Sequence, residues 1–157
     1  NLDKGSKDGI KPGMGVFNSQ GIVGRVKSVS ENYAVAFSVL NTSLLISAKI
    51  KSSEVFGSVQ WDGVNTSEVQ LLYVPRHVKA SKGDTIITSG FNAIFPEGLL
   101  IGQISNVEVN KKDPNYLAIT VKLSTDFSKL NYVYLVENTQ IQELDSLYRQ
   151  SDLPNEY

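Results

Sequence analysis

The chain has 157 residues, of which 41% are hydrophobic and 20% are charged, and these proportions predict a folded globular protein. Fifteen Lys and Arg residues against sixteen Asp and Glu residues give a formal net charge of -1 without a dense basic run, which argues against nucleic acid as a partner. The chain has no Cys and a single histidine, His77, so thiolate and His-rich metal sites are excluded and we expect no cofactor.

Apolar and polar residues alternate along most of the chain, which is the pattern of half-buried β-strands. Turn-forming residues such as Asp62-Gly63 and Asp113-Pro114 separate the alternating runs. Short strands at this spacing predict an all-β fold made of small barrels or a sandwich. The predicted strands lie near residues 14–18, 21–29, 33–39, 44–50, 55–61, 68–74, 84–89, 99–109, 116–123 and 131–137.

Two stretches of the chain share a pattern of glycines. Residues 13–17 (GMGVF) align with residues 83–87 (GDTII), and residues 24–29 (GRVKSV) align with residues 102–107 (GQISNV). This repetition predicts two related β units, although two hairpins that arose independently would give the same pattern. The second copy is longer between its paired glycines, and the extra residues fall in an apolar loop.

That loop spans residues 89–98 and contains Phe91, Ile94 and Phe95, followed by Pro96. Exposed apolar residues of this kind mark contacts, and linked small domains commonly share such contacts with each other. We therefore predict that Phe91, Ile94, Phe95 and Pro96 either bind a partner protein or set the arrangement of the two subdomains.

The apolar period changes after residue 138. Thr139 and Gln142 form a capping-box pattern, and Ile141, Leu144 and Leu147 would then share one face of a helix. We predict a short C-terminal helix or tail over residues 138–157.

A chymotrypsin-like site is the main catalytic alternative, because double β-barrels carry that chemistry and the chain contains His77, Asp84 and Ser89. These three side chains would have to converge in space. Ser89 lacks a Gly-rich oxyanion context, and His77 lies in a loop beside lysines. We therefore predict that the chain is not an enzyme and has no catalytic residues.

Several motifs follow one another in order along the chain. They are DGIKPGM (8–14), GIVGRV (21–26), LYVP (72–75), GDTIITSG (83–90) and FPEGLLIG (95–102). This ordered series resembles the signature of the MreC family of bacterial rod shape-determining proteins. The resemblance runs from about residue 4 to residue 136, and the series is more specific than any single motif.

The resemblance implies two small β-barrel subdomains in tandem on the periplasmic face of the bacterial inner membrane. It also implies a preceding membrane anchor and a coiled coil that mediates self-association, although no apolar run of the present chain reaches the length of a membrane span. We expect the first subdomain at residues 1–54 and the second at residues 55–137. Whether the strand at residues 131–137 returns to the first barrel is left open.

Members of the family are non-catalytic scaffolds of the cell-wall elongation complex. The resemblance therefore implies that the chain binds and activates a class B penicillin-binding protein, with MreD, RodA and MreB as further partners. The alternative functions are an adaptor or sensor domain of another envelope protein and a degenerate chymotrypsin-like protease.

Overall fold

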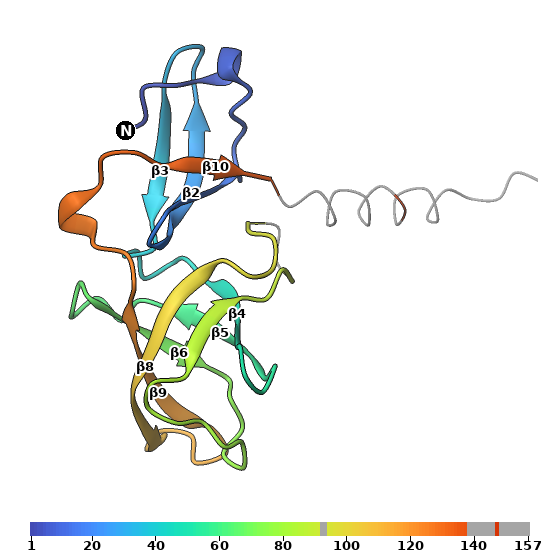
Figure 1. Ribbon diagram of the computed structural model, residues 1–157, viewed down its shortest axis with the longest axis vertical. Coiled ribbons are helices and arrows are strands. Elements are labelled where there is room, and N and C mark those ends of the chain that lie inside the picture. The colour runs from blue at the N-terminus through green and yellow to red at the C-terminus, as the bar shows by residue number, and fades with distance from the viewer. Residues whose placement is uncertain (92–93, 138–146, 148–157) are drawn as a thin grey trace, which may run out of the picture.

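The computed structural model describes residues 1–91, 94–137 and 147, and these residues form an almost entirely β structure (Figure 1). The all-β prediction is confirmed, and each of the ten predicted strands is present. The elements are η1 (Ser6–Asp8), β1 (Gly15–Asn18), β2 (Gly21–Val29), β3 (Ala34–Ser38), β4 (Ile46–Ile50), β5 (Phe56–Gln60), β6 (Glu68–Leu72), β7 (Thr85–Thr88), β8 (Leu100–Val109), β9 (Leu117–Leu123), η2 (Phe127–Lys129) and β10 (Tyr134–Val136).

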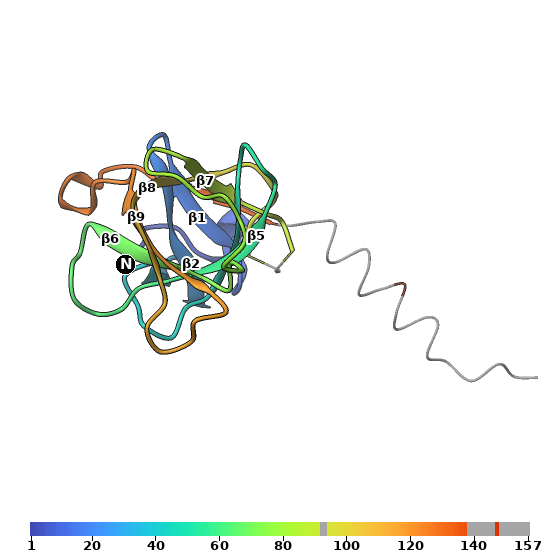
Figure 2. The same ribbon diagram turned by 90° about the horizontal axis from the view of Figure 1, so that it is seen from below.

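The strands form two β units that are stacked along the long axis of the molecule (Figures 1 and 2). The first, here called the open sheet, has the strand order β10-β1-β2-β3. The second, here called the barrel, is closed in the order β4-β5-β6-β9-β8-β7. All neighbouring strands run antiparallel, and each unit has a core of alternate apolar residues, with Ile22 of β2 belonging to the core of the barrel.

The grouping of the strands corrects the expected boundary between residues 54 and 55. That boundary separates β4 from β5, whereas the structure pairs these two strands with each other and pairs β4 also with β7. The reason is that the inward residues of β4 contribute directly to the barrel core. The last strand, β10, pairs with β1 and so joins the open sheet. We propose that residues 39–45 and 124–126 are the two connections between the units.

The open sheet and the barrel contain the same arrangement of hairpins. In the β1–β2 hairpin Val16 lies opposite Gly24, and in the β7–β8 hairpin Ile86 lies opposite Gly102. A β-bulge follows both Val16 and Ile86, so the irregularity also occurs at the same place. The repeated glycine pattern in the sequence therefore corresponds to two hairpins of identical register.

The equivalence extends to the strands on either side. β3 pairs with β2 in the register with which β9 pairs with β8, and a bulge again follows the matching residues Val26 and Ile104. On the other side, Leu135 of β10 lies opposite Val16 as Ile50 of β4 lies opposite Ile86. The order β10-β1-β2-β3 thus matches β4-β7-β8-β9, and the barrel adds β5 and β6.

The predicted tail at residues 138–157 lies outside the described residues, except for Leu147, which is exposed. Among the residues that the structure describes, no helix has the length and apolar composition needed to cross a membrane.

Candidate partner-binding site

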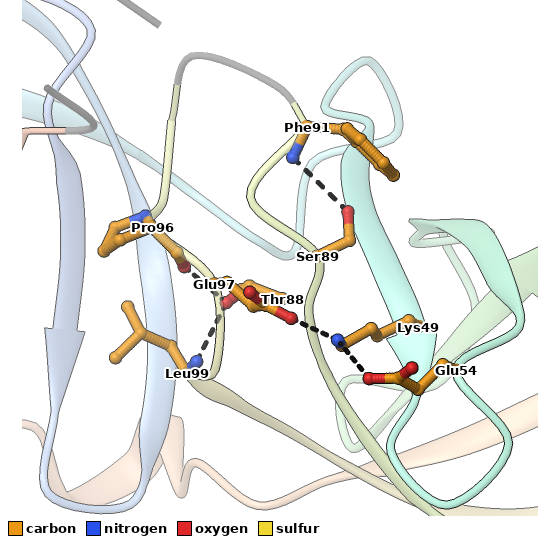
Figure 3. A network of polar contacts seen from close by, with 8 residues as sticks. All are labelled: Lys49, Glu54, Thr88, Ser89, Phe91, Pro96, Glu97 and Leu99. Atoms are coloured by element: carbon orange, nitrogen blue, oxygen red, sulfur yellow. Dashed lines mark hydrogen bonds and ion pairs between the residues drawn. The ribbon is translucent and has the colours of Figure 1, made fainter. Parts of the chain in front are cut away.

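The apolar loop between β7 and β8 is held at its base by Thr88, the last residue of β7. The Thr88 hydroxyl donates a hydrogen bond to the carbonyl oxygen of Pro96 at 2.7 Å and accepts one from the amide of Leu99 at 2.9 Å (Figure 3). The amide of Ser89 donates to the carbonyl oxygen of Ser47, which ties the start of the loop to the barrel wall. Because Thr88 is buried, these bonds are shielded from water and fix where the loop leaves the barrel.

Two of the predicted site residues lie between the barrel and the open sheet. Ile94 is 5% exposed and Phe95 is 1% exposed, and both belong to the apolar core of the barrel. The Phe95 ring also reaches β1 of the open sheet, where a side chain on Gly15 would meet a ring carbon at 2.4 Å. The absence of a side chain at Gly15 therefore provides the space that the Phe95 ring occupies.

Further contacts join the two units around the β1–β2 turn. Ile22 of β2 packs into the barrel core, and its carbonyl oxygen accepts a buried hydrogen bond of 2.8 Å from the Thr125 hydroxyl. Gln20 accepts a hydrogen bond of 2.9 Å from the amide of Asp126. A Cβ on Gly21 would lie 2.5 Å from the carbonyl oxygen of Leu100 in β8. The interface between the open sheet and the barrel is therefore closely packed.

Phe91 differs from Ile94 and Phe95 because its side chain is on the surface. It is 68% exposed and packs edge to face against Phe56, which is 48% exposed, with ring centroids 4.7 Å apart. Phe56 opens β5 and comes from a different part of the chain. The two rings, here called the aromatic pair, form an exposed apolar contact on the side of the barrel.

A buried lysine lies beside the aromatic pair. Lys49 of β4 is opposite Phe56 in the strand register, and its ammonium group contacts the carboxylates of Glu97 in the loop and Glu54 (Figure 3). The hydrogen bond to Glu97 is the main reason that the pKa of Lys49 is raised above its ordinary value of 10.5, and burial opposes this shift. The ion pair therefore connects the β4 wall to the far end of the loop.

Sequence reasoning identified Phe91, Ile94, Phe95 and Pro96 but missed Phe56, Lys49 and Glu97. The alternation of residues 44–50 places Lys49 on the outer face of its strand, and it gives no indication that Glu97 is the partner. Phe56 appeared only as the start of a predicted strand. No local pattern connects residues that are so far apart in the chain.

The three residues of the protease alternative do not come together. Asp84 and Ser89 flank the two ends of β7, which at the usual rise of a strand separates them by roughly 16 Å. The Asp84 carboxylate accepts a hydrogen bond from the amide of Ser81, and the Ser89 hydroxyl accepts one from the amide of Phe91. His77, Asp84 and Ser89 therefore form no triad, and the absence of hydrolytic activity remains a prediction.

The fold and the loop define a class of protein in which two related β units pack closely against each other and present an exposed aromatic contact. The family model described as "Rod shape-determining protein MreC, barrel core" matches residues 1–137. The chain belongs to the MreC family.

Relatives and solved structures agree with this assignment. The cell shape-determining protein MreC of Listeria monocytogenes is 31% identical over 88% of this chain and 48% of the relative, and that of Haemophilus influenzae is 30% identical over 93% and 42%. The chain thus spans less than half of either relative. The solved MreC of L. monocytogenes superimposes with a TM-score of 0.80 at 31% identity, over 87% of this chain and 66% of the other. For MreC from a Helicobacter pylori complex with penicillin-binding protein PBP2, the TM-score is 0.63 at 21% identity, over 77% and 74%.

Proposed function

We propose that this chain is the barrel core of a cell-shape scaffold that binds a class B penicillin-binding protein at the periplasmic face of the bacterial inner membrane. The observation that carries the proposal is the match of residues 1–137 to the MreC family. The complex of H. pylori MreC with PBP2 supports the choice of partner. Activation of that partner, and assembly with MreD, RodA and MreB in the elongation complex, are further parts of the proposal.

We assign the direct contact to the aromatic pair. Phe56 and Phe91 are exposed and adjacent, and aromatic residues, Phe among them, are enriched in protein interfaces. The exposed carboxylate of Glu97, which is paired with the buried Lys49, supplies a polar group at the edge of this surface. Because Ile94 and Phe95 are buried, their role is to hold the loop and the angle between the units, and Pro96 contributes a backbone oxygen to the same anchoring.

The experiment is a binding measurement between the 157-residue chain and the periplasmic part of the cognate class B penicillin-binding protein. Replacing Phe56 and Phe91 together by Ala is expected to raise the Kd at least about tenfold, since burying one such ring is worth roughly 1.5 to 3 kcal/mol. The melting temperature should stay nearly unchanged because both rings are exposed. Tyr33→Ala, which removes an exposed aromatic ring from the open sheet, is the matched control.

Unchanged affinity in the double variant would move the contact away from the aromatic pair. No binding by the unaltered chain would contradict the proposed partner itself. Transpeptidase activity measured with and without the chain tests activation separately.

The coiled coil expected to precede this segment would supply self-association, so we expect the present chain to be monomeric or weakly dimeric by light scattering at micromolar concentration.

A further inference from the structure

The equivalence of the two units shows a strand position that is filled in the barrel and empty in the open sheet. In the barrel, β4 pairs with β7 on one edge and with β5 on the other. In the open sheet, β10 takes the place of β4 and pairs with β1 alone. Leu2 forms an isolated bridge with Ala34 of β3, and Leu71 of β6 pairs with Ile119 at the matching position of β9. At this one pair, the amino-terminal residues therefore take the place of β6. Among the described residues, the place of β5 has no counterpart.

An apolar hollow opens at this place. It has a volume of about 260 Å³ and lies between Leu130 and Val133 on the side of β10 and Leu2 and Ala36 on the side of β3. Its floor is formed by Val16 and Val23, no charged side chain lines it, and Asn1, Ser38 and Asn131 contribute polar groups. In the barrel the corresponding space is filled by Val59 of β5, which is almost fully buried.

The edge of β10 also presents backbone groups to the hollow. In β4 the amide of Ile50 donates to the carbonyl oxygen of Val55 on the β5 side, whereas the amide of Lys51 donates to Thr85 of β7. Leu135 matches Ile50 in register, and Val133 lies where Ala48 lies in β4. The amides of Val133 and Leu135 therefore face the empty position. In the part of the chain that the structure describes, β10 is an edge strand on this side.

We propose that this edge binds an extended segment of a partner protein, which adds as a strand to β10 and inserts an apolar side chain into the hollow. Such strand addition combines main-chain hydrogen bonds with side-chain pockets at alternate positions. The barrel indicates the chemistry of the occupant, because β5 places the small residue Gly57 and the aliphatic residue Val59 at the positions that face β4 and the core. The site is distinct from the aromatic pair, and it does not depend on the proposed partner.

The test uses a synthetic peptide with the sequence of residues 55–61 and the isotope-labelled 157-residue chain. Binding is expected to shift the amide resonances of Val133 and Leu135 and the methyl resonances of Val16 and Val23, and to slow hydrogen exchange at those amides. Two peptide variants of identical mass distinguish strand addition from nonspecific hydrophobic binding. N-methylation at the Gly57 and Val59 positions blocks the edge that pairs with β10 and should weaken binding at least about tenfold.

N-methylation at the Ser58 and Gln60 positions alters the opposite edge and should weaken binding much less. A variant of the protein gives a second test. Ala36 matches Val121 of the barrel, so Ala36→Val places a valine side chain in the hollow. This variant should also weaken peptide binding at least about tenfold. Because the peptide variants leave the protein unaltered, the test does not depend on whether Ala36→Val folds.

Three results would overturn the proposal. The first is equal binding of the two N-methylated peptides, and the second is a set of shifts confined to Ala48 and Ile50, which would mean that the peptide invades the barrel. The third is a shift of the Val133 and Leu135 amides with protein concentration in the absence of peptide, which would identify a second copy of the chain as the occupant.

Discussion

The open sheet and the barrel use the same four-strand arrangement with different degrees of closure. In the barrel, β9 pairs with β6, which in turn pairs with β5. In the open sheet, the matching strand β3 has only the isolated bridge from Ala34 to Leu2 on that side. Both units keep their glycines and bulges at matching positions. The shared register shows that closure is not needed for the four strands to form.

Closure instead changes the size of the side chains inside. The inward position that holds Ala48 in the barrel holds the larger Val133 in the open sheet, and Ile50 is matched by Leu135 of equal size. Five other matching inward positions hold the larger residue in the barrel. The pairs are Val16 and Ile86, Val23 and Ile101, Val26 and Ile104, Ala34 and Ile119, and Ala36 and Val121. A closed barrel must fill its interior to crystal-like density, whereas the open sheet keeps a hollow on one side. We therefore expect the barrel to be the more stable unit and the open sheet to depend on its contact with the barrel.

The strongest test of this dependence is Phe95→Ala. Removing a fully buried ring is expected to cost about 3 to 5 kcal/mol and to lower the Tm by roughly 6 to 20 °C. Because the ring packs against Gly15, hydrogen exchange in β1 should rise as well. Phe91→Ala, four residues earlier in the same loop and exposed, is the control and should change stability by less than about 0.5 kcal/mol. Equal effects of the two substitutions would contradict the assignment of Phe95 to the interface.

The glycines at matching positions allow a direct comparison of the two units. A Cβ on Gly102 would lie 2.0 Å from the carbonyl oxygen of Lys122, and one on Gly24 would lie 1.8 Å from that of Phe37. We expect Gly102→Ala to cost about 3 kcal/mol or more, because β8 and β9 cannot separate within a closed barrel. Gly24→Ala should cost about 1 to 2 kcal/mol, since β3 is free to move at the sheet edge. Urea denaturation measures both, and the reverse order would contradict the role of closure.

The inward pair Val121 and Ala36 tests the difference in filling. Val121→Ala should cost about 2 to 3 kcal/mol, from two lost methyl groups and the cavity that remains. Ala36→Val should be neutral or stabilise the chain by up to about 1 kcal/mol, because the hollow accepts the added methyl groups. Chemical denaturation checks both values. A loss of more than about 1 kcal/mol in Ala36→Val would indicate that the open sheet is already tightly packed.

The smallest effect concerns Lys49, whose place in the open sheet is taken by Tyr134. Since the pKa of Lys49 is raised in the folded chain, its ion pairs stabilise the fold at pH values below 10.5 and lose this effect as the pH rises through the folded pKa. The Tm of the unaltered chain should therefore exceed that of Lys49→Met at pH 8, and the difference should shrink above pH 10.5. Lys122→Met, an exposed lysine on the barrel surface, is the control and should show no such trend. A constant difference across this pH range would exclude the ion pair as its cause.

The local sequence was sufficient to predict the strands and their turns. The period-two alternation places apolar side chains on one face of each strand, and this is a property of neighbouring residues alone. β10 is the informative exception, because the pattern extends over residues 131–137 while the paired strand covers only Tyr134–Val136. Residues 131–133 continue the alternation, but among the described residues no neighbouring strand pairs with them.

The apolar loop was recognised from the sequence, and its division into roles was not. Phe91, Ile94 and Phe95 are equally apolar, yet two of them are buried and one is exposed. Phe95 is buried against Gly15 of the open sheet, and Phe91 packs against Phe56 of the barrel. Both neighbours lie far from the loop along the chain. A pattern of three apolar residues contains no information about these distant neighbours.

The amino-acid sequence by itself therefore determined the strands, the repeated glycine hairpin and, through its ordered motifs, the family. Only the tertiary structure decided that β4 closes the barrel with β5 and β7, that β10 returns to β1, and that Lys49 meets Glu97. The physical reason is that strand formation depends on local alternation, whereas the choice of a neighbouring strand depends on which edges and apolar faces meet once the whole chain has folded.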